Sequence, residues 1–116
     1  IYLLDVDDVS IAFLGGVKLK ELSATQLEVL EGADILILPV GGGSVTGAQD
    51  AVHIINQIEP RIVIPAYYKV PGSKGLESVD TFLKEYSAPR EEVEKLKIHK
   101  KDLPQEDTRV ILIKHA

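Results

Sequence analysis

The sequence predicts an α/β domain in which a mixed sheet carries helices on one face. Three observations predict this class. Two short continuous apolar runs, at residues 34–40 and 61–65, are typical of strands buried on both faces. Helical start and stop signals lie between these runs, and strands that are joined through helices run parallel. Two earlier apolar runs are joined by a short acidic turn, which indicates an antiparallel pair.

The first element is that antiparallel pair. Residues 2–6 and 10–14 are rich in apolar side chains, and Asp7 and Asp8 lie between them. A short acidic or amide turn between two such runs indicates a β-hairpin. The partial alternation of apolar and polar residues in the first run predicts that one of its faces is more buried than the other.

A helix is expected over residues 24–31. Ser23 and Gln26 have the spacing of a capping box, in which each side chain binds a backbone amide at the start of the helix. Gly32 follows the helix and supplies the left-handed conformation that commonly ends one.

The strand at residues 34–40 leads through a glycine-rich loop into a second helix. Thr46 and Gln49 repeat the capping-box spacing, and Pro60 ends the helix. His53 lies opposite the apolar face and is expected to point to water. That apolar face contains Ala48, Ala51, Ile55 and Ile58.

The last third of the chain is less regular. Proline and glycine mark a loop at residues 71–75, and an amphipathic helix is expected at 76–86. A helical turn is expected at 91–96. The apolar run at 109–114 is expected to be the last strand.

Length and composition limit the possible classes. A chain of 116 residues has room for one domain, assigned here to residues 1–116. The absence of cysteine excludes disulfides, thiolate zinc sites and a cysteine nucleophile. No apolar run approaches the ~20 residues that cross a bilayer, and no secretion signal is visible, so a cytoplasmic protein is expected. The first half is acidic and the net charge is −5, which argues against nucleic-acid binding.

Four segments carry a resemblance to a known family. The chain resembles the C-terminal half of metallo-β-lactamase-fold hydrolases, in the branch that includes ascorbate-6-phosphate lactonase. The segments are AFLGG at residues 12–16, ILPVGG at 37–42, EPRIVIPAYYK at 59–69 and KIHKKDLP at 97–104.

This resemblance implies one half of an αββα sandwich. The N-terminal half of the family carries a His-x-His-x-Asp-His motif, which does not occur in this chain. The C-terminal half normally adds an aspartate after Leu-Gly, where this chain has Gly16, and a histidine after Ile-Pro-x, where it has Tyr67. The start at Ile1 without a methionine also suggests a piece of a longer protein.

Replacement of both ligands predicts a degenerate metal centre. Glycine has no donor side chain, and tyrosine binds a metal well only as a phenolate, although a phenol keeps its proton until about pH 10. We therefore expect no metal ligand, no catalytic residue and no cofactor in this chain, which would be a structural or binding module. The alternative is a metal-dependent hydrolase of phosphoesters or lactones whose remaining ligands, with zinc or another divalent ion, lie on an absent N-terminal half.

Two segments are candidates for binding an anion or another ligand. Gly41, Gly42, Gly43 and Ser44 lead from a strand into a helix, where backbone amides can surround an anion. The other interpretation of these glycines is a tight turn.

The second candidate segment follows the next strand. Tyr67, Tyr68 and Lys69 lie just after its C-terminal end, where ligands of α/β proteins usually bind. The other interpretation is that Tyr67 fills the volume of an absent histidine and that Tyr68 packs.

The half-sandwich interpretation also predicts a partner. Six Leu- or Ile-sized side chains left in water on an uncovered sheet face would forfeit on the order of 10 kcal/mol of burial. An N-terminal half-domain or a second copy of the chain is therefore expected as the partner, and neither nucleic acid nor a membrane is.

Overall fold

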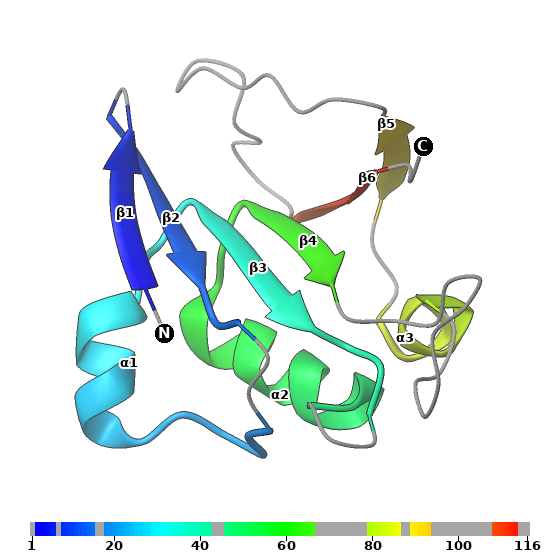
Figure 1. Cartoon of the computed structure of the whole chain (residues 1–116), viewed down its shortest axis with the longest axis horizontal. Coiled ribbons are helices and arrows are strands. Elements are labelled where there is room, and N and C mark those ends of the chain that lie inside the picture. The colour runs from blue at the N-terminus through cyan, green and yellow to red at the C-terminus, as the bar shows by residue number, and fades with distance from the viewer. Residues whose placement is uncertain are drawn as a thin grey trace.

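The computed structural model shows a mixed sheet with three helices (Figure 1). It describes residues 2–6, 8–15, 18–42, 46–66, 79–86, 89–93 and 108–113. The elements in chain order are β1 Tyr2–Val6, β2 Val9–Phe13, α1 Ala24–Leu30, β3 Ile35–Pro39, α2 Ala48–Ile58, β4 Ile62–Ala66, α3 Val79–Glu85, β5 Arg90–Val93 and β6 Arg109–Ile113.

The sheet has six strands in the order β1-β2-β3-β4-β6-β5. β1 and β2 form the predicted antiparallel hairpin, in which Asp8 takes the turn with a positive φ of 67°. All other neighbouring strands are parallel, and β3 pairs with β4 along its full length. The predicted mixed sheet is confirmed.

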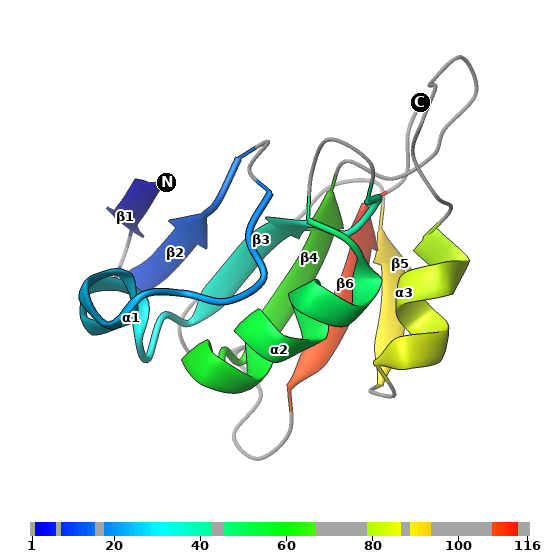
Figure 2. The same ribbon diagram turned by 90° about the horizontal axis from the view of Figure 1, so that it is seen from below.

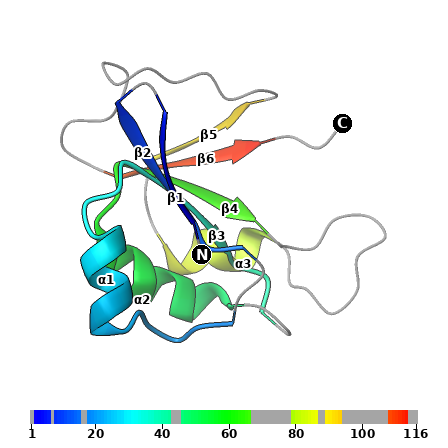
Figure 3. The ribbon, with the colours of Figure 1, turned by 60° about the vertical axis from the view of Figure 1, so that its left-hand side comes forward.

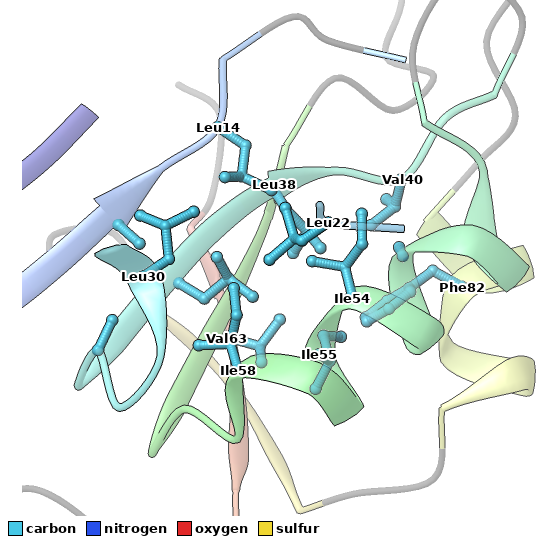
Figure 4. Close-up of a cluster of buried hydrophobic side chains, with 14 of the residues drawn as sticks. Leu14, Leu22, Leu30, Leu38, Val40, Ile54, Ile55, Ile58, Val63 and Phe82 are labelled. Atoms are coloured by element: carbon cyan, nitrogen blue, oxygen red, sulfur yellow. The ribbon is translucent and has the colours of Figure 1, made fainter. Parts of the chain in front are cut away.

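All three helices lie on the same side of the sheet, as predicted (Figures 2 and 3). Alternate strand residues such as Leu36 and Leu38 are fully buried in the core on this helix face. Leu38 and Val63 face the buried side chains of α2 there (Figure 4). The apolar face of α2 points into this core as the periodicity predicted. Its buried residues are Ala48, Ala51, Ile54, Ile55 and Ile58.

The opposite face of the sheet holds a second, smaller apolar cluster. No helix in the described part of the chain lies on this face. Its buried members nevertheless retain only 2–4% of their accessible surface. They are Val9, Ile35, Ile62, Ile64 and Ile111. The strands are therefore apolar on both sides, as expected from their continuous apolar sequences.

The capping signals of α1 are confirmed. The amide of Gln26 donates to Ser23 Oγ at 3.2 Å, and the Ser23 amide donates to Gln26 Oε1 at 2.9 Å. Gly32 follows the helix with φ of 79°, which only glycine adopts without strain.

The same signal is wrong at Thr46. The N-cap of α2 is Gly47, and no side chain caps this helix. Thr46 lies one residue earlier and is 1% exposed. Its hydroxyl binds the backbone of Leu19, 27 positions away in sequence. A tertiary contact therefore replaces the local cap.

The expected helical turn at residues 91–96 is also wrong. Residues 90–93 form the edge strand β5, which pairs in parallel with β6. Charged residues are common on edge strands because one side of such a strand faces water. In this segment strand pairing outweighs the weak helical pattern. Residues 94–96, and residues 76–78 of the expected third helix, lie outside the described residues.

Within the described residues, no helix is both long enough and apolar enough to cross a bilayer. The longest helix in the described part of the chain, α2, has 11 residues. A spanning helix needs about 20.

Candidate functional site

The candidate site lies at the edge of the sheet where β2, β3 and β4 end. These strands are parallel neighbours, so their carboxyl ends share that edge. The amide of Leu14 donates to the Ile37 carbonyl at 3.0 Å, and the Val40 amide donates to the Ala66 carbonyl at 3.0 Å. The chain positions that follow these three strands are therefore brought together, and ligands of parallel sheets usually bind at this edge.

The structure describes only part of the predicted site. Gly41 is buried and Gly42 is half-buried, directly after the end of β3. The other predicted positions lie outside the described residues. They are Gly16, Gly43, Ser44, Tyr67, Tyr68 and Lys69. In the sequence, Gly16 follows β2 and Tyr67 follows β4, and these two strands flank β3 in the sheet.

Gly42 has the geometry of a tight turn. Its φ is 73°, and its amide donates to the Thr46 carbonyl at 3.1 Å. A Cβ added at Gly47 would lie 3.5 Å from the Gly42 backbone, so the two ends of the loop are close together. The Gly42 amide is thus used within the loop, which favours the turn interpretation over an anion cradle at this residue.

The connection from β2 to α1 passes along α2 (Figure 3). Thr46 and Gln57 each form a pair of side-chain hydrogen bonds with this connection, at Leu19 and Leu22 respectively. Neither contact was predicted from the sequence, because each joins residues that lie far apart in the chain. Leu19 and Thr46 are separated by 27 positions, and Leu22 and Gln57 by 35.

The described residues at this edge do not fit a metal centre. Leu14, Gly15, Val40, Gly42 and Ala66 stand nearest the strand ends, and none has a side chain that can bind a metal. Nowhere in the described ranges do three His, Cys, Asp or Glu side chains gather to hold an ion. A zinc centre needs about four nitrogen, sulfur or oxygen donors.

The single histidine in the described residues lies away from the strand ends. His53 is on α2, its side chain is 55% exposed, and Nε2 lies 3.6 Å from Glu21 Oε2. Exposure of His53 to water is as predicted. Such an exposed pair contributes little to stability. His99 and His115 lie outside the described residues.

A polar network lies at the opposite ends of these strands, where β2, β3 and β4 begin. Asp34 Oδ2 accepts hydrogen bonds from the Ser10 amide at 3.0 Å and from Ser10 Oγ at 3.2 Å. The Asp34 carbonyl accepts from the amides of Arg61 and Ile62, and Arg61 Nε lies 3.9 Å from Asp34 Oδ1. The network joins the starts of β3 and β4 to β2, so its role is structural.

Comparison with known sequences gives a family model and a curated relative. The family model described as "Beta-lactamase superfamily domain" matches residues 1–67, more than half of the chain. A UPF0173 family protein from Pyrococcus abyssi is 39% identical over 57 residues, which cover 49% of this chain and 26% of that protein.

A solved structure has the same fold. It is a candidate Zn-dependent hydrolase of the metallo-β-lactamase superfamily from Thermotoga maritima, with a TM-score of 0.83 and 26% identity. The match covers 96% of this chain and 56% of that one, so the chain spans about half the length of this relative. The sheet, its helices and these matches together establish that the chain belongs to the metallo-β-lactamase superfamily.

Proposed function

We propose that this chain is a degenerate metallo-β-lactamase-like domain that performs no catalysis and acts as a structural or binding module. Its expected partner is an N-terminal half-domain or a second copy. The observation that carries the proposal is the chemistry of the residues after β2 and β4. Gly16 and Tyr67 occupy the two positions at which the resemblance implies an aspartate and a histidine.

The donor chemistry supports the loss of metal binding. A glycine offers a metal only its backbone, and a neutral phenol is a poor zinc ligand. Because both positions have changed, neither supplies a strong side-chain ligand that could hold the metal when the other is lost. Within the described residues, no group of three or more His, Cys, Asp or Glu side chains gathers that could hold a metal ion instead.

An apolar surface at β1 supports the proposed partner. Leu4 and Val6 are 52% and 51% exposed, and they pair with Ile11 and Val9, which belong to the cluster on the face opposite the helices. Leu3 is 41% exposed and pairs with Ala12 of the helix-face core. The other apolar residues of both clusters are buried or partly buried, so the exposed side chains of β1 form an open apolar surface at the edge of the described sheet. A partner would extend or cover the sheet there.

A metal-dependent hydrolase is the second candidate. The Thermotoga maritima relative is described as a candidate Zn-dependent hydrolase, and it is longer than this chain. If this activity were present, its remaining metal ligands would lie on a polypeptide segment that this chain does not contain. Phosphoesters or lactones would be its substrates, with zinc or another divalent ion as the cofactor.

Anion binding at residues 41–44 is a third candidate with less support. The loop precedes α2, whose first-turn amides favour an anion, but Asp50 already supplies a negative charge in that turn. The Gly42 amide is also bonded to Thr46. If an anion did bind, phosphate would raise the melting temperature, and the rise would grow with the logarithm of the phosphate concentration once this exceeds the Kd.

Native mass spectrometry of the purified chain, with and without zinc, tests the main proposal. We expect no zinc adduct and a mass that corresponds to a complex with a second polypeptide or copy. Uptake of one or two zinc ions per chain would contradict the loss of the site. A monomer at micromolar concentration would contradict the need for a partner.

Two variants give this measurement a control. Tyr67→His with Gly16→Asp restores both family ligands and should raise zinc uptake above that of the wild type. Tyr67→Phe removes the only side-chain oxygen donor that either position offers. If the wild type bound zinc and Tyr67→Phe abolished it, the hydrolase alternative would replace the degenerate one, and phosphodiester and lactone turnover would then be assayed.

A further inference from the structure

We propose that Thr46 and Gln57 are positioning residues that hold residues 19–22, just before α1, in a fixed conformation without a metal ion. In the implied family a metal ligand lies in the connection from β2 to α1, at the position of Gly16. Here two side chains, one just before α2 and one in its last turn, bind the connection instead.

The contact at Leu19 is made entirely by the Thr46 hydroxyl. Thr46 Oγ1 accepts a hydrogen bond from the Leu19 amide at 2.8 Å and donates one to the Leu19 carbonyl at 3.2 Å. Thr46 is 1% exposed and is the single buried polar side chain among the described residues. Because water cannot replace a partner at a buried site, breaking this pair would leave polar groups unsatisfied.

The contact at Leu22 has the same design. Gln57 Oε1 accepts from the Leu22 amide at 2.9 Å, and Gln57 Nε2 donates to the Leu22 carbonyl at 3.4 Å. An amide side chain that both donates and accepts in this way replaces a strand partner. Leu22 is itself buried in the helix-face core, so the contact fixes both its backbone and its side chain.

The two contacts hold residues 19–22 against α2 from both ends of the segment. An irregular connection of this kind has no strand partner for its amides, and its backbone groups must find partners elsewhere. Side chains supply these partners here. The start of α1 at Ser23 follows immediately, so the same contacts fix the direction in which α1 leaves the sheet.

Amide hydrogen exchange of the purified chain in EDTA, followed by NMR, tests this inference. We expect the Leu19 and Leu22 amides to be protected without metal. Thr46→Val should speed exchange at Leu19 by about tenfold or more relative to Leu22, and Gln57→Leu should do the reverse. The ratio of the two rates within one sample separates a local contact from general destabilisation, which would raise both rates alike.

Matched variants complete the design. Thr46→Ser keeps the hydroxyl and should retain protection at Leu19, while Gln57→Glu can accept from the Leu22 amide but cannot donate to its carbonyl. Thr25→Val and Gln49→Leu, at exposed positions of α1 and α2, should leave both rates unchanged.

Unprotected amides in EDTA, or equal acceleration of both amides in each variant, would overturn the inference. Protection that appeared only when zinc was added would overturn it as well. Zinc uptake with amides already protected in EDTA would contradict only the proposed loss of the metal site.

Discussion

The strands β1 and β3 differ in burial although both have five residues and mostly apolar sequences. In β3, Ile35, Leu36 and Leu38 are no more than 3% exposed, whereas Leu4 and Val6 of β1 are about half exposed. β3 has a parallel neighbour on each side and helices over one face, while β1 pairs with β2 at the edge of the sheet. Position in the sheet, more than composition, therefore decides what an apolar strand contributes to stability.

Removal of a side chain from the centre of the sheet should have the largest effect. Leu36→Ala leaves a cavity in the helix-face core, because Leu36 is 0% exposed. We expect a loss of about 2–5 kcal/mol in the free energy of unfolding. Urea denaturation followed by far-UV circular dichroism measures it. An equal loss in the free energy of unfolding for Leu3→Ala would contradict the proposed difference between β3 and β1.

Loss of the polar network at the start of β3 should come next. Asp34→Ala leaves the amide and hydroxyl of Ser10 without this acceptor, and we expect a cost of about 1–3 kcal/mol. Asp5→Ala on β1 is the matched control, since Asp5 is exposed and lies opposite Ser10 in the hairpin. Equal unfolding midpoints in urea for the two variants would show that the network contributes nothing.

A smaller change on the face opposite the helices sharpens the comparison of the two faces. Ile64 is 4% exposed there, and Ile64→Val removes one methylene group. We expect a loss of about 0.5–1.5 kcal/mol, as for a well-packed core. A loss near zero in thermal or urea unfolding would mean that this face is loosely packed in the isolated chain and depends on a partner.

The smallest effect on stability is expected at β1. Leu4→Thr replaces an exposed leucine by a β-branched residue that strands favour, so the free energy of unfolding should change by less than about 0.5 kcal/mol. The same change should weaken assembly if β1 is the partner surface, which analytical ultracentrifugation would detect. Val29→Thr, on the exposed side of α1, is the control and should leave assembly unaltered.

Much of the fold could be predicted from local patterns. The capping box at Ser23, the apolar face of α2 and the hairpin before it depend on residues within a few positions of each other, so the sequence displays them directly. The family resemblance also identified Gly16 and Tyr67 as the positions to examine. The loss of the metal site at these two positions stays a prediction, because neither residue lies in the described part of the chain.

The tertiary structure alone decided the features that depend on distant residues. Thr46 has the sequence signal of a helix cap, yet its buried side chain binds the backbone of Leu19, whose amide belongs to no strand. Residues 90–93 form a strand because β6 offers them a free edge. The sequence by itself determined the local elements and the family, while the order of the strands, the open surface at β1 and the contacts of Thr46 and Gln57 follow from packing between segments far apart in the chain.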